Sequence, residues 1–236
     1  MAIYVTSDLH GLMLADLQKL LDKAGFGEAD WLFILGDVID RQNDGGVSVL
    51  RWLLCQPNAQ LLLGNHEAML LSCDFLFEEI TEDSVEAFSE EKMQLWYNYT
   101  QNGGDVTLKA LGALRETDPE AVEDILAYLR EAPLYETVEA GGRHFLLVHA
   151  GLENFSPDKK LSEYTADELL WAWLEPDTVY FDGVMTVLGH TPTLAFGREH
   201  KGKIMFKPTW IDVDVGVHCG NPPALLRLDD LQEFYL

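Results

Sequence analysis

The stretch Trp31-Leu32-Phe33-Ile34-Leu35-Gly36-Asp37-Val38-Ile39-Asp40-Arg41 decides the fold of this chain. Its first five residues are apolar, which is typical of a buried strand, and a glycine and an aspartate follow where that strand should end. Two similar arrangements flank it. The apolar run 3–5 leads to Asp8-Leu9-His10, and the run 60–63 leads to Gly64-Asn65-His66-Glu67. A short strand followed by a polar cluster therefore recurs along the first part of the chain.

The spacing of these clusters predicts a parallel sheet. Asp8 and Asp37 lie 29 positions apart, and Asp37 and Asn65 lie 28 positions apart. Each interval matches one strand–helix–strand crossover of about 30 residues, and helix-like segments at 14–24 and 46–54 fill the two intervals. Because parallel strands bring their carboxyl ends to one edge of a sheet, we expect the three clusters to meet there.

The second half of the chain repeats the arrangement. The run 144–148 leads to His149-Ala150-Gly151, and the run 185–188 leads to Gly189-His190-Thr191-Pro192. Between the two halves, amphipathic acidic stretches predict an inserted helical cap at about 67–132, broken by Gly103-Gly104. Its helices are expected at 67–79, 84–101 and 118–131, a later helix at 166–174, and further strands at 134–140, 203–206, 209–214 and 223–228. We predict a single domain, 1–236.

Composition narrows the classes of function. The net charge of −24 argues against long nucleic acids as partners, but bound cations would still admit a small phosphorylated substrate. The chain has no apolar run of about 18 residues, so we expect no membrane span, and no secretory signal is visible at its N-terminus. The odd number of cysteines, Cys55, Cys73 and Cys219, favours reduced, mostly buried thiols in the cytoplasm.

The polar clusters supply ligands for two metal ions. Asp8 and His10 can reach one ion, and the two oxygens of Asp37 can bridge to a second. An amide oxygen and two imidazoles remain for that second ion. Mixed oxygen and nitrogen ligands suit Mn, with Fe or Zn as alternatives, better than Mg or Ca. A hydroxide held between two such ions can attack phosphorus. The expected ligands are Asp8, His10, Asp37, Asn65, His149 and His190.

Three further residues are candidates for catalysis. His66 follows Asn65 directly, so it should lie near the substrate without binding metal itself. Asp40 is placed to pair with His66 and to keep it protonated as the general acid for the leaving oxygen. Arg41 offers a planar pair of donors to phosphate oxygens.

The order of the five clusters resembles that of the calcineurin-like metallophosphoesterases, specifically their phosphoprotein phosphatase branch. That family has Asp-x-His, Gly-Asp-x-x-Asp-Arg, Gly-Asn-His-Glu, His-(Gly/Ala)-Gly and Gly-His, and the match covers residues 3 to about 216. The resemblance implies an α/β fold with a β-sandwich core flanked by helices and an inserted helical cap. It also implies the same six metal ligands, the His66–Asp40 acid pair, and Arg41 on phosphate.

The chain departs from the family pattern at three positions. Gln42 and Leu63 replace a usual glycine and a usual arginine, and Trp173 stands where a second phosphate-binding arginine often lies. The basic segment 198–203 could replace that arginine, although a solvated hairpin loop is the favoured reading. We expect a serine/threonine, or dual-specificity, protein phosphatase or small-phosphoester hydrolase. The alternatives are a dinucleoside polyphosphate hydrolase and a phosphate-binding module without catalysis.

Two other groups of residues are open to two interpretations. Asp212 and Asp214 could orient metal-bound histidines, or they could simply belong to a strand edge. Trp96, Tyr97 and Tyr99 could stack on a base or a phosphotyrosine, but their helical spacing favours packing within the fold.

Overall fold

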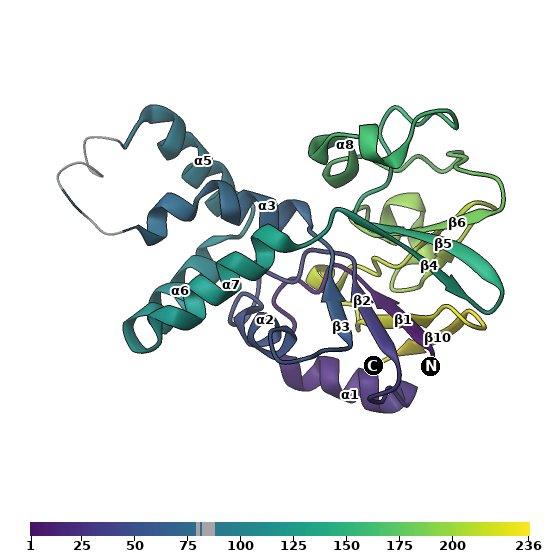
Figure 1. Ribbon diagram of the computed structural model, residues 1–236, viewed down its shortest axis with the longest axis horizontal. Helices are drawn as coiled ribbons and strands as arrows, with labels where there is room; N and C mark the ends of the chain where they lie inside the picture. Colours follow the sequence, from purple (N-terminus) through teal and green to yellow (C-terminus); the bar gives the residue numbers. More distant parts are fainter. Residues whose placement is uncertain (79–80, 82–87) are drawn as a thin grey trace.

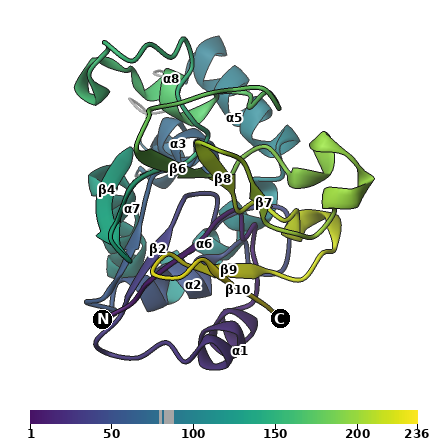
Figure 2. The same cartoon turned by 90° about the vertical axis from the view of Figure 1, so that its right-hand side faces the viewer.

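The computed structural model describes residues 1–78, 81 and 88–236 of the chain. The described part is built on two five-stranded sheets (Figures 1 and 2). The first sheet has the order β10-β9-β1-β2-β3. Its strands are β1 (Ile3–Thr6), β2 (Trp31–Ile34), β3 (Ala59–Leu61), β9 (Ala224–Arg227) and β10 (Gln232–Tyr235). β1, β2 and β3 pair in parallel, as the spacing of the first three clusters predicts.

The second sheet has the order β4-β5-β6-β8-β7. Its strands are β4 (Tyr135–Ala140), β5 (Arg143–Val148), β6 (Val184–Leu188), β7 (Met205–Phe206) and β8 (Trp210–Asp212). β5, β6 and β8 are parallel to one another, whereas β4 and β7 run antiparallel at the two edges. The strands that precede His149 and His190 are therefore neighbours in one sheet.

One hydrophobic core joins the two sheets. Val5 and Ile34 of the first sheet belong to the same buried cluster as Phe145 and Leu147 of β5. Successive side chains of a strand point to opposite faces, so Leu146 of β5 enters a second cluster on the outer face of its sheet. The protein is thus a sandwich of two sheets, and the expected mixed α/β fold is confirmed.

Helices surround this sandwich. The described α-helices are α1 (Leu14–Ala24), α2 (Val47–Leu53), α3 (Asn65–Ser72), α5 (Glu90–Gln101), α6 (Asp105–Thr117), α7 (Pro119–Glu131) and α8 (Ala166–Leu170). α1 and α2 lie on the first sheet, on the side away from α8 (Figure 1). Of the segment expected as a cap, α7 buries Ile125 and Leu129 in the common core, so this part packs on the sandwich.

Several boundaries differ from the sequence-based prediction. The helix expected at 67–79 is α3 followed by a short 3-10 turn (Asp74–Phe77), and α6 was not anticipated as a separate helix. The first residues of the helix expected at 84–101 lie outside the described residues, and α5 covers the last twelve of its positions. The strand β10 was also missed.

The cysteines form no disulfide. Only Cys73 is buried, while Cys55 and Cys219 are exposed, so the expectation of mostly buried thiols is wrong for two of the three. Among the described helices, none has the length and apolar character that crossing a membrane requires.

Candidate metal centre and active site

The strand ends of both sheets converge on one cleft. Asp8 and Asp37 follow β1 and β2, Asn65 and His66 begin α3 after β3, and His149 and His190 follow β5 and β6. A cleft of about 410 Å³ opens here, lined by His10, Asp37, Arg41, Asn65, His66, Asn102, Trp171, Trp173, Pro192, His190 and His218. All nine residues predicted from the sequence lie in or directly beneath it.

Most of these site residues have a backbone conformation that side chains rarely adopt. Asp8, His10, Asp37, Asp40, Arg41 and His190 all have φ between 42° and 78°. Such conformations cost of order 1–3 kcal/mol each and persist where the surrounding structure fixes them. Backbone hydrogen bonds supply that constraint, because the N–H of His10 donates to the carbonyl of Asp37 at 2.9 Å and that of Arg41 to Gly103 at 2.9 Å.

Two glycines allow the strand ends to approach closely. A Cβ on Gly36 would lie 2.6 Å from Cα of Gly64 and 2.7 Å from Nδ1 of His149. A Cβ on Gly189 would lie 2.3 Å from Oδ2 of Asp8. All three distances are too short for any side chain, so these positions require glycine if the metal-ligand candidates are to meet.

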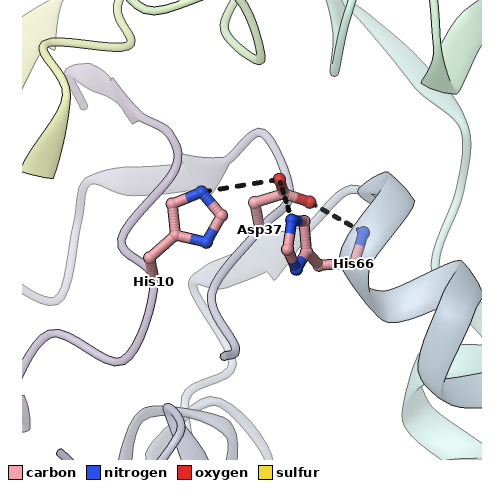
Figure 3. Close-up of side chains that lie close together, drawn as sticks. All are labelled: His10, Asp37 and His66. Atoms are coloured by element: carbon pink, nitrogen blue, oxygen red, sulfur yellow. Dashed lines mark hydrogen bonds and ion pairs between the residues drawn. The ribbon is translucent and has the colours of Figure 1, made fainter. Parts of the chain in front are cut away.

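Asp37 is the centre of the cluster. Its Oδ2 atom lies 3.7 Å from Nε2 of His10 and 3.8 Å from Nε2 of His66, as Figure 3 shows. Its Oδ1 atom lies 3.5 Å from Nε2 of His149. Two groups of donor atoms share this carboxylate, one with His10 and His66 and the other with His149 and His190, and each group spans at most 4.8 Å.

In the second group, ring nitrogens of two histidines lie close to one amide oxygen. Nδ1 of His149 lies 2.6 Å from the carbonyl oxygen of Leu35, which can only accept, so Nδ1 carries the proton and Nε2 carries the lone pair. That Nε2 lies 2.8 Å from Oδ1 of Asn65, and Nδ1 of His190 lies 3.0 Å from the same oxygen. Converging acceptors at these distances fit a cation between them.

The protonation of the buried histidines favours metal binding. Burial lowers the pKa of His10 well below its usual value and lowers that of His149 as well. Burial, with the neighbouring His149, lowers the pKa of His190 to about 3. Neutral imidazoles with free nitrogen lone pairs are the form that binds metal.

The carboxylate at the centre is surrounded by like charges. Burial and the neighbouring Asp8 and Glu67 raise the pKa of Asp37 well above its ordinary value. A cation beside Asp37 would relieve this cost. The donor atoms and the electrostatics of the site therefore both fit bound metal.

His66 belongs to a different chemical environment from the ligand candidates. Its Nδ1 donates to Oδ2 of Asp40 at 2.6 Å, and Nη2 of Arg41 lies 3.1 Å from its Nε2. A guanidinium beside Nε2 is unfavourable for a metal ion on the same atom. Although His66 lies close enough to Asp37 to bind metal, its hydrogen bond to Asp40 holds the ring as the predicted acid–base role requires.

Two hydroxyls that the sequence analysis missed hold Asp40 in place. The hydroxyls of Tyr99 and Thr107 donate to Oδ1 of Asp40 at 2.7 and 2.6 Å. Tyr99 is buried, so it packs within the fold as its helical spacing favours, but Trp96 and Tyr97 are exposed on α5. No sequence signal links Asp40 to residues 59 and 67 positions away.

Glu67 also has a role that was not assigned from the sequence. Its carboxylate accepts from the N–H groups of Asp37 and Val38, both at 2.8 Å, and from Gly64 at 3.1 Å. It thereby ties the end of β2 to the start of α3. Its place in the Gly-Asn-His-Glu cluster was the available signal.

The remaining candidates have mixed outcomes. Trp173 lines the cleft and is 62% exposed, and no described residue of the basic segment 198–203 lines that cleft. Asp212 and Asp214 accept from backbone N–H groups at 2.9 and 2.8 Å rather than from the histidine rings. Backbone carbonyls lie against the rings of His10 and His149 instead. His218, unassigned from the sequence, lines the cleft beside His10, with 5.0 Å between ring centroids.

Comparisons with known proteins identify relatives of this chain. Residues 1–215 match the family model described as calcineurin-like phosphoesterase. A symmetrical bis(5'-nucleosyl)-tetraphosphatase of Acidovorax sp. (strain JS42) is 28% identical over 72% of this chain and 48% of its own length. Serine/threonine-protein phosphatase 2 of Salmonella typhimurium (strain LT2) is 27% identical over 72% of this chain and 67% of its own.

A solved structure shares the fold. The crystal structure of a cold-active protein-tyrosine phosphatase from a psychrophilic Shewanella species superimposes with a TM-score of 0.58 at 18% identity, covering 98% of this chain and 76% of that one. The chain spans about half the length of most curated relatives that it matches. Since the family model covers most of the sequence, the chain belongs to the calcineurin-like phosphoesterases.

Proposed function

We propose that this site hydrolyses the phosphoanhydride of a dinucleoside polyphosphate. The observation that carries the proposal is the buried donor cage around Asp37, with His66 and Arg41 at its open side. The choice of substrate is supported by the names of relatives, several of which are symmetrical bis(5'-nucleosyl)-tetraphosphatases. The protein phosphatase expected from the sequence is therefore the second candidate, and the alternative named with it becomes the first.

The candidate ligands would hold two cations. Asp8, His10 and Asp37 would bind one, and Asp37, Asn65, His149 and His190 would bind the other. Their mixture of oxygen and nitrogen donors favours manganese, with iron or zinc as alternatives. When bound, such ions would activate water and neutralise charge on the phosphate oxygens.

The chain's own residues would orient the phosphate and move the proton. A phosphate oxygen is a stronger acceptor for a guanidinium than a neutral imidazole is, so Arg41 would turn from His66 to the substrate. Nε2 of His66, released by Arg41, would then take up a proton from solvent and pass it to the leaving oxygen. Asp40 would hold the ring in place and stabilise its protonated form through the 2.6 Å hydrogen bond to Nδ1.

Phosphoprotein hydrolysis is a second candidate because of one comparison. The chain covers 67% of the Salmonella serine/threonine-protein phosphatase, compared with 48% of the Acidovorax tetraphosphatase. The relative whose length is better matched by this chain is thus named as a protein phosphatase. The same cage and acid would serve either reaction.

Turnover measurements separate these candidates. The manganese-loaded protein would be assayed with diadenosine tetraphosphate, a phosphoserine peptide and p-nitrophenyl phosphate. We expect kcat/KM for the dinucleotide to exceed that for the peptide at least tenfold. A higher kcat/KM for the peptide than for the dinucleotide would favour phosphoprotein hydrolysis. If the protein hydrolysed none of the three substrates, a phosphate-binding module without catalysis would be the remaining interpretation. The Asp37→Asn variant serves as the control for contaminating phosphatases.

A further inference from the structure

A second cavity adjoins the metal cleft. It has a volume of about 550 Å³ and lies between α3, α5 and α8. Asn102 and Trp171 line both this cavity and the metal cleft, so these two residues form a wall that the cavities share. Figure 1 shows α5 and α8 on either side of α3. We call this cavity the side pocket.

The walls of the side pocket are apolar and aromatic. Met69 of α3 and Leu170 of α8 contribute aliphatic surface, and Tyr97 and Trp171 contribute rings. Tyr97 is 57% exposed and Trp171 is 45% exposed, so neither ring is consumed by packing in the core. Flat aromatic ligands gain most from such walls, because each ring face can stack on a neighbour.

Polar side chains that line the side pocket can form hydrogen bonds with the edge of a flat ring. The side-chain amides of Gln101 and Asn102 offer both donors and acceptors, and the carboxylate of Asp167 offers acceptors only. The described lining residues include no lysine, arginine or histidine. The side pocket therefore suits a neutral ring that carries an amino group, and it does not suit a phosphate or an acidic peptide.

We propose that the side pocket binds a nucleobase of the substrate whose phosphates occupy the metal cleft. This inference rests on the proposed function, which supplies a substrate with a base joined to a phosphate chain. The shared wall at Trp171 lets one molecule occupy both cavities. The indole stacks on the base, and the amides and Asp167 bind its edge. The chain thus selects nucleoside phosphates through residues outside the metal cage.

Binding of adenosine tests the side pocket without metal or turnover. The H2 and H8 protons of adenosine would be followed by NMR during titration with the metal-free protein. Two variants alter the pocket at exposed positions: Trp171→Ala removes the stacking ring, and Ser72→Trp fills the space. Trp96→Ala is the matched control, because Trp96 is 43% exposed and lies outside the pocket lining.

We expect saturable binding by the wild type and by Trp96→Ala, and at least tenfold weaker binding by both pocket variants. Absence of saturable binding to the wild type, or equal binding by all four proteins, would overturn the proposal. So would preferential binding of N-acetyl-phenylalanine amide, which would identify the pocket as a site for a peptide side chain.

The base site and the proposed reaction can fail independently, and the measurements distinguish the two failures. If the wild type binds adenosine at the side pocket but prefers the phosphopeptide in turnover, the proposed reaction fails and the base site stands. If the wild type hydrolyses diadenosine tetraphosphate while the pocket variants retain its KM, the reaction stands and the base site fails.

Discussion

Nδ1 of His66 lies 2.6 Å from Oδ2 of Asp40, and both side chains are buried beneath the cleft. The other oxygen of Asp40 accepts from the hydroxyls of Tyr99 and Thr107. One carboxylate is thus fixed by two donors from the helical insert while it orients the imidazole of the active site. The insert therefore contributes directly to the placement of His66.

This arrangement predicts that Asp40→Asn lowers kcat by about 10²–10⁴-fold. With Tyr99 and Thr107 both donating, the new side chain would turn its oxygen toward the hydroxyls and its NH2 toward His66. Nδ1 would then have to accept, so the doubly protonated ring that donates from Nε2 would lose the partner that stabilises it. Tyr99→Phe leaves the carboxylate in place and should cost much less. Equal losses in the two variants, measured with metal content unchanged, would contradict this reasoning.

The role of His66 as proton donor predicts a dependence on the leaving group. His66→Asn should keep the metal content of the wild type and lower kcat by about 10²-fold or more for phenyl phosphate. The loss should be smaller for p-nitrophenyl phosphate, whose leaving group needs little protonation. Metal analysis accompanies the kinetics, because loss of an ion in this variant would instead make His66 a ligand.

The buried Asp214 predicts a dependence of stability on pH. Burial and the neighbouring Asp8 raise the pKa of Asp214 well above its ordinary value, and among the described residues its Oδ2 has no hydrogen-bond partner. When burial raises the folded-state pKa of a carboxyl group, the folded protein is destabilised as the pH rises from the unfolded-state pKa of that group to its folded-state pKa. The isosteric amide does not titrate, so Asp214→Asn avoids this loss.

Thermal unfolding of the metal-free protein tests this prediction. Asp214→Asn should raise Tm by about 3 °C or more at pH 8, because 1 kcal/mol shifts Tm by about 2–4 °C in a chain of this size. The gain should shrink toward pH 4. The exposed Asp177→Asn serves as the control. A gain that is the same at both pH values, or larger in acid, would show that the charge of Asp214 is not responsible.

The strands that could be predicted from the sequence are those with a strong local pattern of residues. The apolar run before Asp37 and the crossover spacing on either side of it locate β1, β2 and β3, and they bring Asp8, Asp37 and Asn65 to one edge. Parallel pairing then follows from topology alone. The side chains expected at the site meet because each lies within a few residues of a strand end.

The features that were missed depend on contacts between distant segments. Nothing near Tyr99 in the sequence indicates that its hydroxyl reaches Asp40, and the use of Glu67 as an acceptor depends on how β2 and α3 meet. The exposed faces of Trp96 and Tyr97 could not be predicted from helical spacing, because that spacing does not show which side of α5 has a partner. Tertiary packing decides all of these.

The central claim is that Asp37 binds both metal ions, since its two oxygens lie toward opposite groups of histidines. Metal analysis of wild type and Asp37→Asn after equilibration with manganese, paired with turnover of the best substrate, tests it most directly. We predict two ions per wild-type chain, loss of both from the variant, and a fall in kcat of roughly 10³-fold or more. A variant that retains two ions, or that retains turnover, would contradict the account.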